Sequence, residues 1–150
     1  MQTFLPYCDY TAVAQVLDMK RLGKQRVEAY QILKTNQRVA MAMGDTKGIA
    51  WCKHPAVLMW RGYERELCKY GLTMCTEWIR RGYKDNLSGI FKEALLTSFE
   101  EDKLPPWYGN EKLYSSHRSK LLEKNREHYS KYFFNPLEEG LPYYWPSLIS

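Results

Sequence analysis

The spacing of apolar residues most restricts the fold of this 150-residue chain, because they recur every three or four positions along much of it. The longest such run lies between residues 57 and 79. Its apolar residues are Val57, Leu58, Trp60, Leu67, Leu72, Cys75 and Ile79. This spacing places apolar side chains on one side of a helix, and no segment alternates as a half-buried strand does. The sequence therefore predicts an all-α fold, a compact single-domain helical bundle over residues 1–150 with an irregular aromatic- and Pro-rich C-terminal tail.

Start and stop signals set the expected helix boundaries. The helices are expected from Asp9 to about Asp18, from near Leu22 to about Met43, from His54-Pro55 to Arg81-Gly82, from Asp85 to Phe99, and onward from Asn110. Asp9, Asp85 and Asn110 have side chains that accept hydrogen bonds from the first turn of a helix. Within the long third helix, Gly62 and Gly71 mark close packing or a bend. From Tyr129 onward we expect irregular chain along the surface.

Charge is concentrated in two stretches, although the whole chain carries a formal charge of only +5. Residues 20–38 hold six basic side chains and one acid, and residues 112–131 hold six basic side chains and two acids. If both stretches face the same side, they form a positive surface suited to a phosphate backbone. The alternative is that these cations only solvate exposed helix faces.

Several functional classes are excluded by missing patterns. No apolar run approaches the roughly 18 residues of a membrane span, and the start of the chain lacks the pattern of a secretory signal. Cys8, Cys52, Cys68 and Cys75 show no CxxC spacing, so we expect reduced thiols and a cytoplasmic protein. A zinc site from Cys52 and His54 with Cys68 or Cys75 fits no standard spacing. Nucleotide-binding glycine loops and hydrolase motifs are absent, and no cofactor is expected.

Glu28 is the residue most informative about chemistry. Arg21, Lys24, Glu28 and Gln31 are three or four positions apart, so they share one face of a helix. Nearby positive charge favours the ionised form of a lone carboxylate. Such a group can stabilise a developing cation on a substrate or act as a base. The alternative is an ordinary Lys24–Glu28 helix pair, which contributes only about 0.2–0.5 kcal/mol.

A second candidate is the aromatic and basic segment at 129–134, which follows the second basic stretch. Aromatic rings beside a cation are typical of surfaces that stack on bases or wedge between them. The alternative is an apolar clamp on the helical core, which is at least as good an explanation of Phe133 and Phe134.

Taken together, five segments resemble the endonuclease V type of pyrimidine-dimer DNA glycosylase and abasic-site lyase, particularly a branch of small bacterial and phage proteins. They are Lys20–Glu28, His54–Ala56, Glu77–Tyr83, Ser116–Lys124 and Tyr129–Phe133. The resemblance covers nearly the full length. It implies a single-domain enzyme that acts on double-stranded DNA, as a monomer without an obligate protein partner, and that extrudes a nucleotide to reach the lesion.

In the family that the chain resembles, an N-terminal α-amine attacks the sugar at C1′ and an imine forms after the base leaves. The resemblance makes Glu28 the group that stabilises the cationic sugar and Met1 the candidate nucleophile, because the bulk of Gln2 disfavours removal of Met1. Lys24 is a second candidate amine. Where the family has arginines flanking its glutamate, this chain has Val27 and Gln31.

The expected DNA contacts come from the two basic stretches and the aromatic segment. They are Arg21, Arg26, Arg118, Lys120, Lys124, Tyr129, Lys131 and Tyr132. The resemblance assigns Lys120 and Lys124 to the DNA backbone, and Tyr129, Lys131 and Tyr132 to a loop near the lesion. Two other functions remain open, a non-catalytic DNA-binding module and a different reaction on a modified base or nucleotide.

Overall fold

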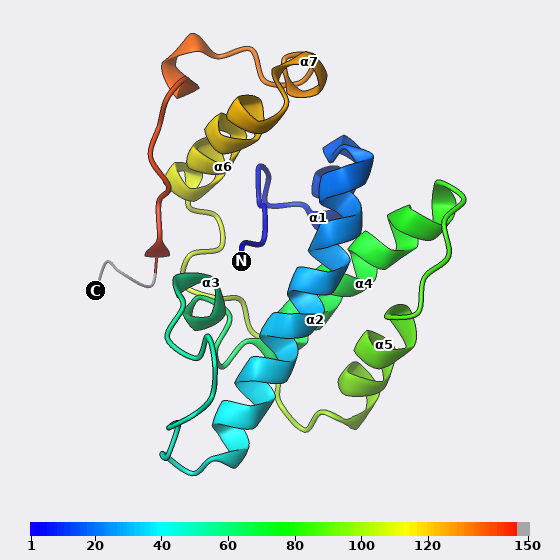
Figure 1. The fold of residues 1–150 in the computed structure, drawn as a ribbon, viewed down its shortest axis with the longest axis vertical. Helices are drawn as coiled ribbons and strands as arrows, with labels where there is room; N and C mark the ends of the chain where they lie inside the picture. Colours follow the sequence, from blue (N-terminus) through cyan, green and yellow to red (C-terminus); the bar gives the residue numbers. More distant parts are fainter. Residues whose placement is uncertain (147–150) are drawn as a thin grey trace.

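The structure is a computed structural model that describes residues 1–146, and all regular elements in that range are helical. The predicted all-α class is confirmed. The elements are α1 (Tyr10–Val16), α2 (Met19–Met41), α3 (Pro55–Leu58), α4 (Glu64–Arg80), α5 (Ser88–Thr97), α6 (Glu111–Lys124), α7 (Arg126–Tyr129) and the 3-10 turn η1 (Pro136–Glu138). The two long helices α2 and α4 pack on each other at the centre, with α1 and α5 against α4 (Figure 1).

Two glycines on the central helices allow a neighbouring helix to pack closely, α4 at Gly23 and α5 at Gly71. A Cβ atom on Gly23 of α2 would lie 2.8 Å from the ring of Trp78, and one on Gly71 of α4 would lie 2.5 Å from the ring of Phe91. Both distances are shorter than real carbon contacts, so a larger residue at either position would force the facing ring to shift. The prediction of close packing at Gly71 is confirmed.

The prediction of a single long helix from 54 to 82 is wrong, because this part of the chain forms two helices, α3 and α4. Gly62 adopts a φ of +86°, a left-handed conformation that ends helical continuity and that side chains other than glycine rarely adopt. The carboxylate of Glu64, the first residue of α4, accepts the Gly62 amide at 3.1 Å. His54 caps α3 as expected, with Nδ1 accepting the amide of Ala56 at 3.0 Å.

Most other helix starts agree with the sequence signals. Asp9 caps α1 through the amides of Thr11 and Ala12, and Asn110 caps α6. Helix α2 begins at Met19, three residues before the expected start, directly after Asp18.

The C-terminal tail was expected to be irregular and to lie on the surface from Tyr129 onward, but its first residue is helical and buried. Tyr129 lies in the short helix α7 and is fully buried, and its ring stacks on that of Phe133 at 5.7 Å. The Tyr129 hydroxyl accepts the amide of Asp18 at 3.1 Å and donates to the carboxylate of the same residue. These two aromatics clamp the tail onto the core, which is the apolar alternative considered for this segment.

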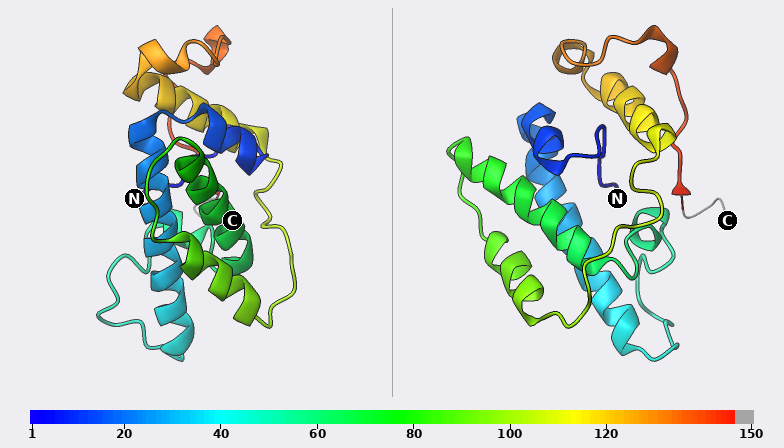
Figure 2. Two further views of the ribbon diagram at one scale, coloured as in Figure 1. Left: turned by 90° about the vertical axis from the view of Figure 1, so that its right-hand side faces the viewer. Right: turned by 180° about the vertical axis from the view of Figure 1, so that it is seen from behind.

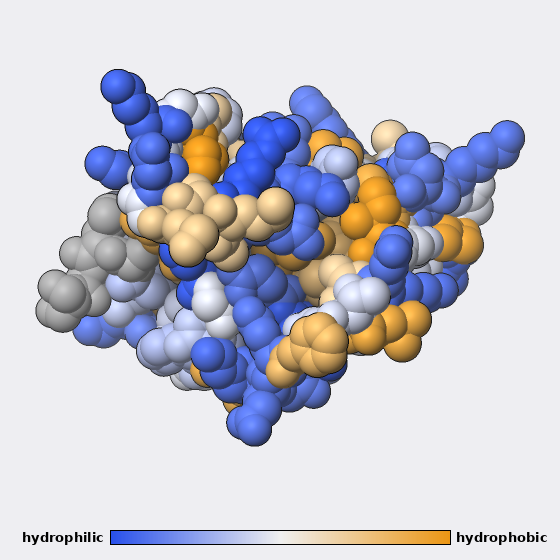
Figure 3. Space-filling model, turned by 90° about the horizontal axis from the view of Figure 1, so that it is seen from below, coloured by the Kyte–Doolittle hydropathy of each residue, from blue (hydrophilic) through white to orange (hydrophobic). Residues whose placement is uncertain are grey.

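The end of the molecule where α2 and α5 finish carries exposed apolar side chains. They are Met41, Met43, Leu96 and Phe99, which lie at or near the last turns of these two helices. Viewed from that end, the apolar surfaces are separated by hydrophilic ones (Figure 3). No helix within residues 1–146 is long and apolar enough to cross a membrane.

Candidate functional site

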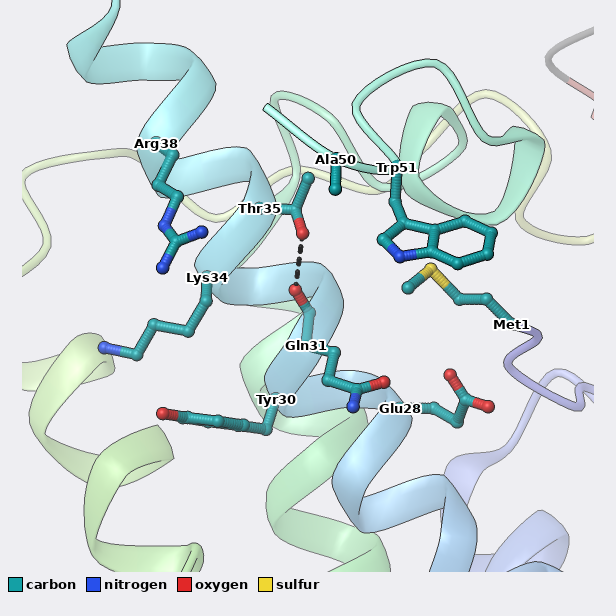
Figure 4. A pocket seen from close by; sticks show the side chains of 9 residues that line it. All are labelled: Met1, Glu28, Tyr30, Gln31, Lys34, Thr35, Arg38, Ala50 and Trp51. Atoms are coloured by element: carbon teal, nitrogen blue, oxygen red, sulfur yellow. Dashed lines mark hydrogen bonds between the residues drawn. The ribbon is translucent and has the colours of Figure 1, made fainter. Parts of the chain in front are cut away.

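Two surface cavities of about 450 Å³ each meet at Met1 and Glu28, which line both of them. The first cavity lies along the middle of α2 and is closed on the other side by Trp51, from the loop before α3 (Figure 4). The second lies between the start of α2 and the end of α6, with Lys124 and Trp145 on its wall. Pockets of this size are typical of small-ligand sites.

The N-terminal segment reaches this junction through the interior, between α6 and α2 (Figures 1 and 2). The Oε1 atom of Gln25 on α2 accepts the amide of Phe4 at 2.8 Å. The hydroxyl of Tyr70 on α4 lies 2.7 Å from the carbonyl oxygen of Phe4 and 2.9 Å from the same Gln25 atom. Burial, together with the charge of Glu28, raises the pKa of Tyr70 far above its usual range, so this hydroxyl stays a donor.

Further contacts fix the segment on its other sides. The indole of Trp60 donates to the Thr3 hydroxyl at 2.9 Å, and Nδ1 of His117 on α6 accepts the amide of Leu5 at 2.8 Å. Arg118 donates to the carbonyl of Pro6 at 2.7 Å. The residues after Met1 are therefore held in place by side chains from α2, α4, α6 and the turn after α3. Met1, which lines both cavities, directly precedes this fixed segment.

Glu28 is a nearly buried carboxylate in cationic surroundings. Its residue is only 6% exposed, and its Oε1 atom lies 3.9 Å from Nζ of Lys24. Among the described residues that line the two cavities, Glu28 is the only acid. The cations that line them are Lys20, Arg21, Lys24, Lys34, Arg38 and Lys124. A negative oxygen surrounded by positive charge can stabilise a cation that develops on a bound substrate.

His54 lies between two tryptophans that line the cavities, although it lines neither cavity itself. Its ring makes edge contacts with Trp51 at 5.8 Å and with Trp145 at 6.0 Å, one tryptophan from each cavity. Burial and the nearby N-terminal ammonium lower the pKa of His54, so the imidazole is neutral at physiological pH. His54 is thus both the cap of α3 and a neutral neighbour of the Met1 amine.

The structure brings together Met1, Arg21, Lys24, Glu28 and Lys124 of the residues that the sequence singled out. Arg21 also pairs with Asp18 at 3.1 Å. Lys124 extends over the ring of Phe4, with Nζ 6.0 Å from its centroid.

Two of the arginines that the sequence predicts to bind DNA have ion-pair partners within the protein. Arg26 is buried, pairs with Asp85 at 2.8 Å and lies over the Trp78 ring. Arg118 pairs with Glu138 at 2.6 Å and with Glu111, in addition to its bond to the N-terminal segment. Arg26 and Arg118 thereby each connect their helix to a segment that is distant in sequence. Neither lines the two cavities.

The remaining predicted residues lie outside the junction. Tyr129 is buried, as described above. Lys120 lies close to the ring of Tyr143, at 5.2 Å, and within 3.5 Å of Glu123. Lys131 and Tyr132 are exposed after α7 and line neither cavity.

Sequence reasoning did not single out Lys34, Arg38, Trp51 or Trp145. Lys34 and Arg38 continue the helical face that begins at Lys24, so extending the spacing by two turns would have found them. The two tryptophans have no such signal, because loops and the C-terminal segment bring them to the site.

Within residues 1–146, no group of three or more His, Cys, Asp or Glu side chains is placed to hold a metal ion. All four cysteines are free, and Cys52, Cys68 and Cys75 are buried.

A family model described as pyrimidine dimer DNA glycosylase matches residues 1–90. The matched part runs from the N-terminal segment into α5 and contains Met1, Lys24, Glu28 and Trp51. Neither curated proteins nor solved structures give a significant match to the chain.

Proposed function

The chain belongs to the pyrimidine dimer DNA glycosylase family, and from this premise we propose that it removes a damaged or modified pyrimidine from duplex DNA as a monomer in the cytoplasm. The nucleophile is the α-amine of Met1, and Glu28 stabilises the positive charge on the sugar. The observation that carries the proposal is that Met1 and Glu28 meet where the two cavities join.

The fixed path of the N-terminal segment supports this role. A free chain end loses much conformational freedom when it must hold one reactive position, and the bonds from Gln25, Tyr70 and His117 have already restricted the chain a few residues away. An amine positioned in advance reacts faster because less orientation is needed in the transition state.

The reaction follows from the groups at the junction. The neutral amine nitrogen donates its electron pair to C1′ while the bond between C1′ and the base breaks, and the base leaves with the electron pair of the broken bond and takes up a proton. After the attached nitrogen loses a proton, its electron pair forms the C1′=N bond of a protonated imine while the C1′–O4′ bond breaks and O4′ takes up a proton, which opens the sugar ring. The Glu28 carboxylate stabilises the positive charge in both steps.

Strand cleavage is the proposed second step, which gives the abasic-site lyase activity. A base removes a proton from C2′ of the imine, a C2′–C3′ double bond forms, and the bond from C3′ to the phosphate oxygen breaks. Water then hydrolyses the imine and frees the amine. Lys20, Lys24, Lys34, Arg38 and Lys124 are the cations proposed to hold the phosphates around the reacting nucleotide.

Borohydride trapping on ultraviolet-irradiated duplex DNA tests the proposal, because borohydride reduces an imine to a stable covalent adduct. We expect an adduct with the wild-type chain, none after acetylation of the N-terminus, and none with Glu28→Gln, which still binds DNA. Glu93→Gln, an exposed acid on α5, is the control and should behave as wild type. Base release without a trapped adduct refutes the imine step. DNA binding with no base release favours the non-catalytic module.

A further inference from the structure

Met1 carries an oxidisable thioether on the same residue as the proposed reactive amine. The residue is partly exposed and lines both cavities, so a small oxidant reaches it from solvent. Peroxides convert a methionine thioether into a sulfoxide, and methionine sulfoxide reductases reverse the change. Because the product is polar where the thioether is apolar, one added oxygen atom alters the surface at the junction of the two cavities.

The sulfur of Met1 has neighbours that suit a thioether better than a sulfoxide. Figure 4 shows the sulfur beside the Trp51 indole, in the part of the cavity that also holds the Glu28 carboxylate. A thioether packs favourably against an aromatic ring. A sulfoxide oxygen carries partial negative charge, which the negative face of an aromatic ring and a carboxylate both repel.

These neighbours are held in place, so the adjustment to an added oxygen falls on Met1. The Trp51 carbonyl accepts the amide of His54 at 2.9 Å, and the His54 ring supports the indole by an edge contact at 5.8 Å. Glu28 is nearly buried and belongs to α2. The side chain of Met1 packs against the hydrophobic core, and this contact helps to hold the amine in one position. A sulfoxide that leaves this place therefore loosens the amine beside Glu28.

We propose that Met1 is a reversible oxidation site, and that its sulfoxide form binds DNA but forms the imine slowly. The sulfur donates a lone pair to one oxygen of hydrogen peroxide and the O–O bond breaks. The transferred oxygen passes its proton to the departing hydroxide, which leaves as water, so sulfur is oxidised and peroxide is reduced. The inference rests on the proposed function, because it concerns the amine of the same residue.

The other sulfur atoms that solvent reaches lie away from the cavities and can be removed. Within residues 1–146 they belong to exposed residues that line neither cavity, namely Cys8, Met19, Met41 and Met43. The remaining methionines and cysteines apart from Met1 are buried. A four-site variant with Cys8→Ser, Met19→Leu, Met41→Leu and Met43→Leu therefore keeps Met1 as the accessible sulfur.

The test treats the four-site variant with hydrogen peroxide, removes the peroxide with catalase, and measures borohydride trapping on ultraviolet-irradiated duplex DNA. Mass spectrometry of the N-terminal peptide should show one oxygen atom added to Met1. We expect single-turnover adduct formation by the oxidised fraction to slow about 10- to 100-fold, as for a slightly misplaced reactive group. Binding of the same DNA should stay within about twofold, because the cations are unchanged. Methionine sulfoxide reductases should restore the adduct rate.

Norleucine incorporated in place of methionine supplies the matched control, because a methylene group replaces the sulfur and the side chain keeps nearly the same shape. The four-site variant that carries norleucine should form the adduct at the same rate before and after peroxide treatment. An equal loss of rate in this protein shows that peroxide acts on another group, and it overturns the inference.

Two further results overturn the inference. One is an unchanged adduct rate in protein whose Met1 is fully oxidised, and the other is a lost adduct while Met1 stays unoxidised. All three results leave the proposed function standing, because the untreated protein still forms the adduct. If the untreated protein forms no adduct, the proposed function itself fails and this inference fails with it.

Discussion

Gln25 accepts the backbone amide of Phe4 at 2.8 Å, one helical turn before Glu28 on the same face of α2. This single bond connects the chain end that bears the Met1 amine with the helix that bears the carboxylate. The relative position of the two reactive groups therefore depends on Gln25, an uncharged residue that lines the second cavity.

Gln25→Leu should slow the reaction without weakening DNA binding. The substitution leaves the Phe4 amide and the Tyr70 hydroxyl without their shared acceptor, so stability should fall by about 1–3 kcal/mol. In single-turnover assays at saturating DNA, borohydride adduct formation should slow at least tenfold while the dissociation constant stays within about twofold. Gln37→Leu, on the same helix, is the control. Equal adduct rates in both variants would show that Gln25 does not position the amine.

Residues added before Met1 should abolish the reaction. An extension of two glycines moves the free amine away from Glu28, while the bonds to Phe4 and Leu5 hold the rest of the segment in place. We expect no borohydride adduct, unchanged thermal stability and DNA binding within a few-fold of wild type. Intact-mass spectrometry must first confirm a free Met1 in the unextended protein. Full activity in the extended protein would point to another amine, with Lys24 as the nearest candidate.

Arg26 and Arg38 should respond in opposite ways to replacement by methionine. Arg26→Met leaves the buried Asp85 carboxylate without its ion-pair partner, so urea unfolding should show a loss of about 3–5 kcal/mol. Arg38→Met should leave stability nearly unchanged and reduce the slope of log affinity against log salt by about one, as for one lost phosphate contact. If Arg26→Met instead changes the salt slope at full stability, Arg26 is a DNA contact after all.

Stability should fall as pH drops below the ordinary histidine range, and His117 is the main cause. Burial lowers the pKa of His117 to about 3 from an ordinary value of 6.5, so the unfolded chain takes up a proton there that the folded chain does not. The contribution is complete above pH 6.5 and is lost between pH 6.5 and 3, with a slope approaching about 1.4 kcal/mol per pH unit.

Urea denaturation from pH 7.5 to 5 measures this slope before most carboxylates titrate. His117→Asn keeps an acceptor for the Leu5 amide and should remove the larger part of the slope. The lowered pKa of His54 acts in the same direction and leaves a smaller remainder. A slope that His117→Asn leaves unchanged would contradict the assignment.

Signals from neighbouring residues predicted most helix starts correctly, but they did not predict where the long apolar pattern is interrupted. Caps such as Asp9 and Asn110 depend on neighbouring residues, so the sequence reveals them. The break at Gly62 did not follow from spacing, because the apolar pattern continues through it and only the backbone conformation interrupts the helix.

The sequence predicted the residues of the candidate site that share one helix face, but not the contacts between distant parts of the chain. Glu28 and Lys24 lie on one helix face and were found from their spacing. The ion pairs of Arg26 and Arg118 were not foreseen, because their partners Asp85 and Glu138 lie 59 and 20 residues away in the chain. Trp51 reaches the site through a loop conformation that no periodicity describes.

The buried path of the first residues also sets an order of assembly during synthesis. Leu5 leaves the ribosome early, yet its partner His117 is made 112 residues later. Until α6 emerges, the leading segment lacks the partners that α6 contributes, and Met1 has only part of its support beside Glu28. A nascent or truncated chain that ends before α6 therefore lacks a fully fixed amine, and the reactive geometry is completed late in translation.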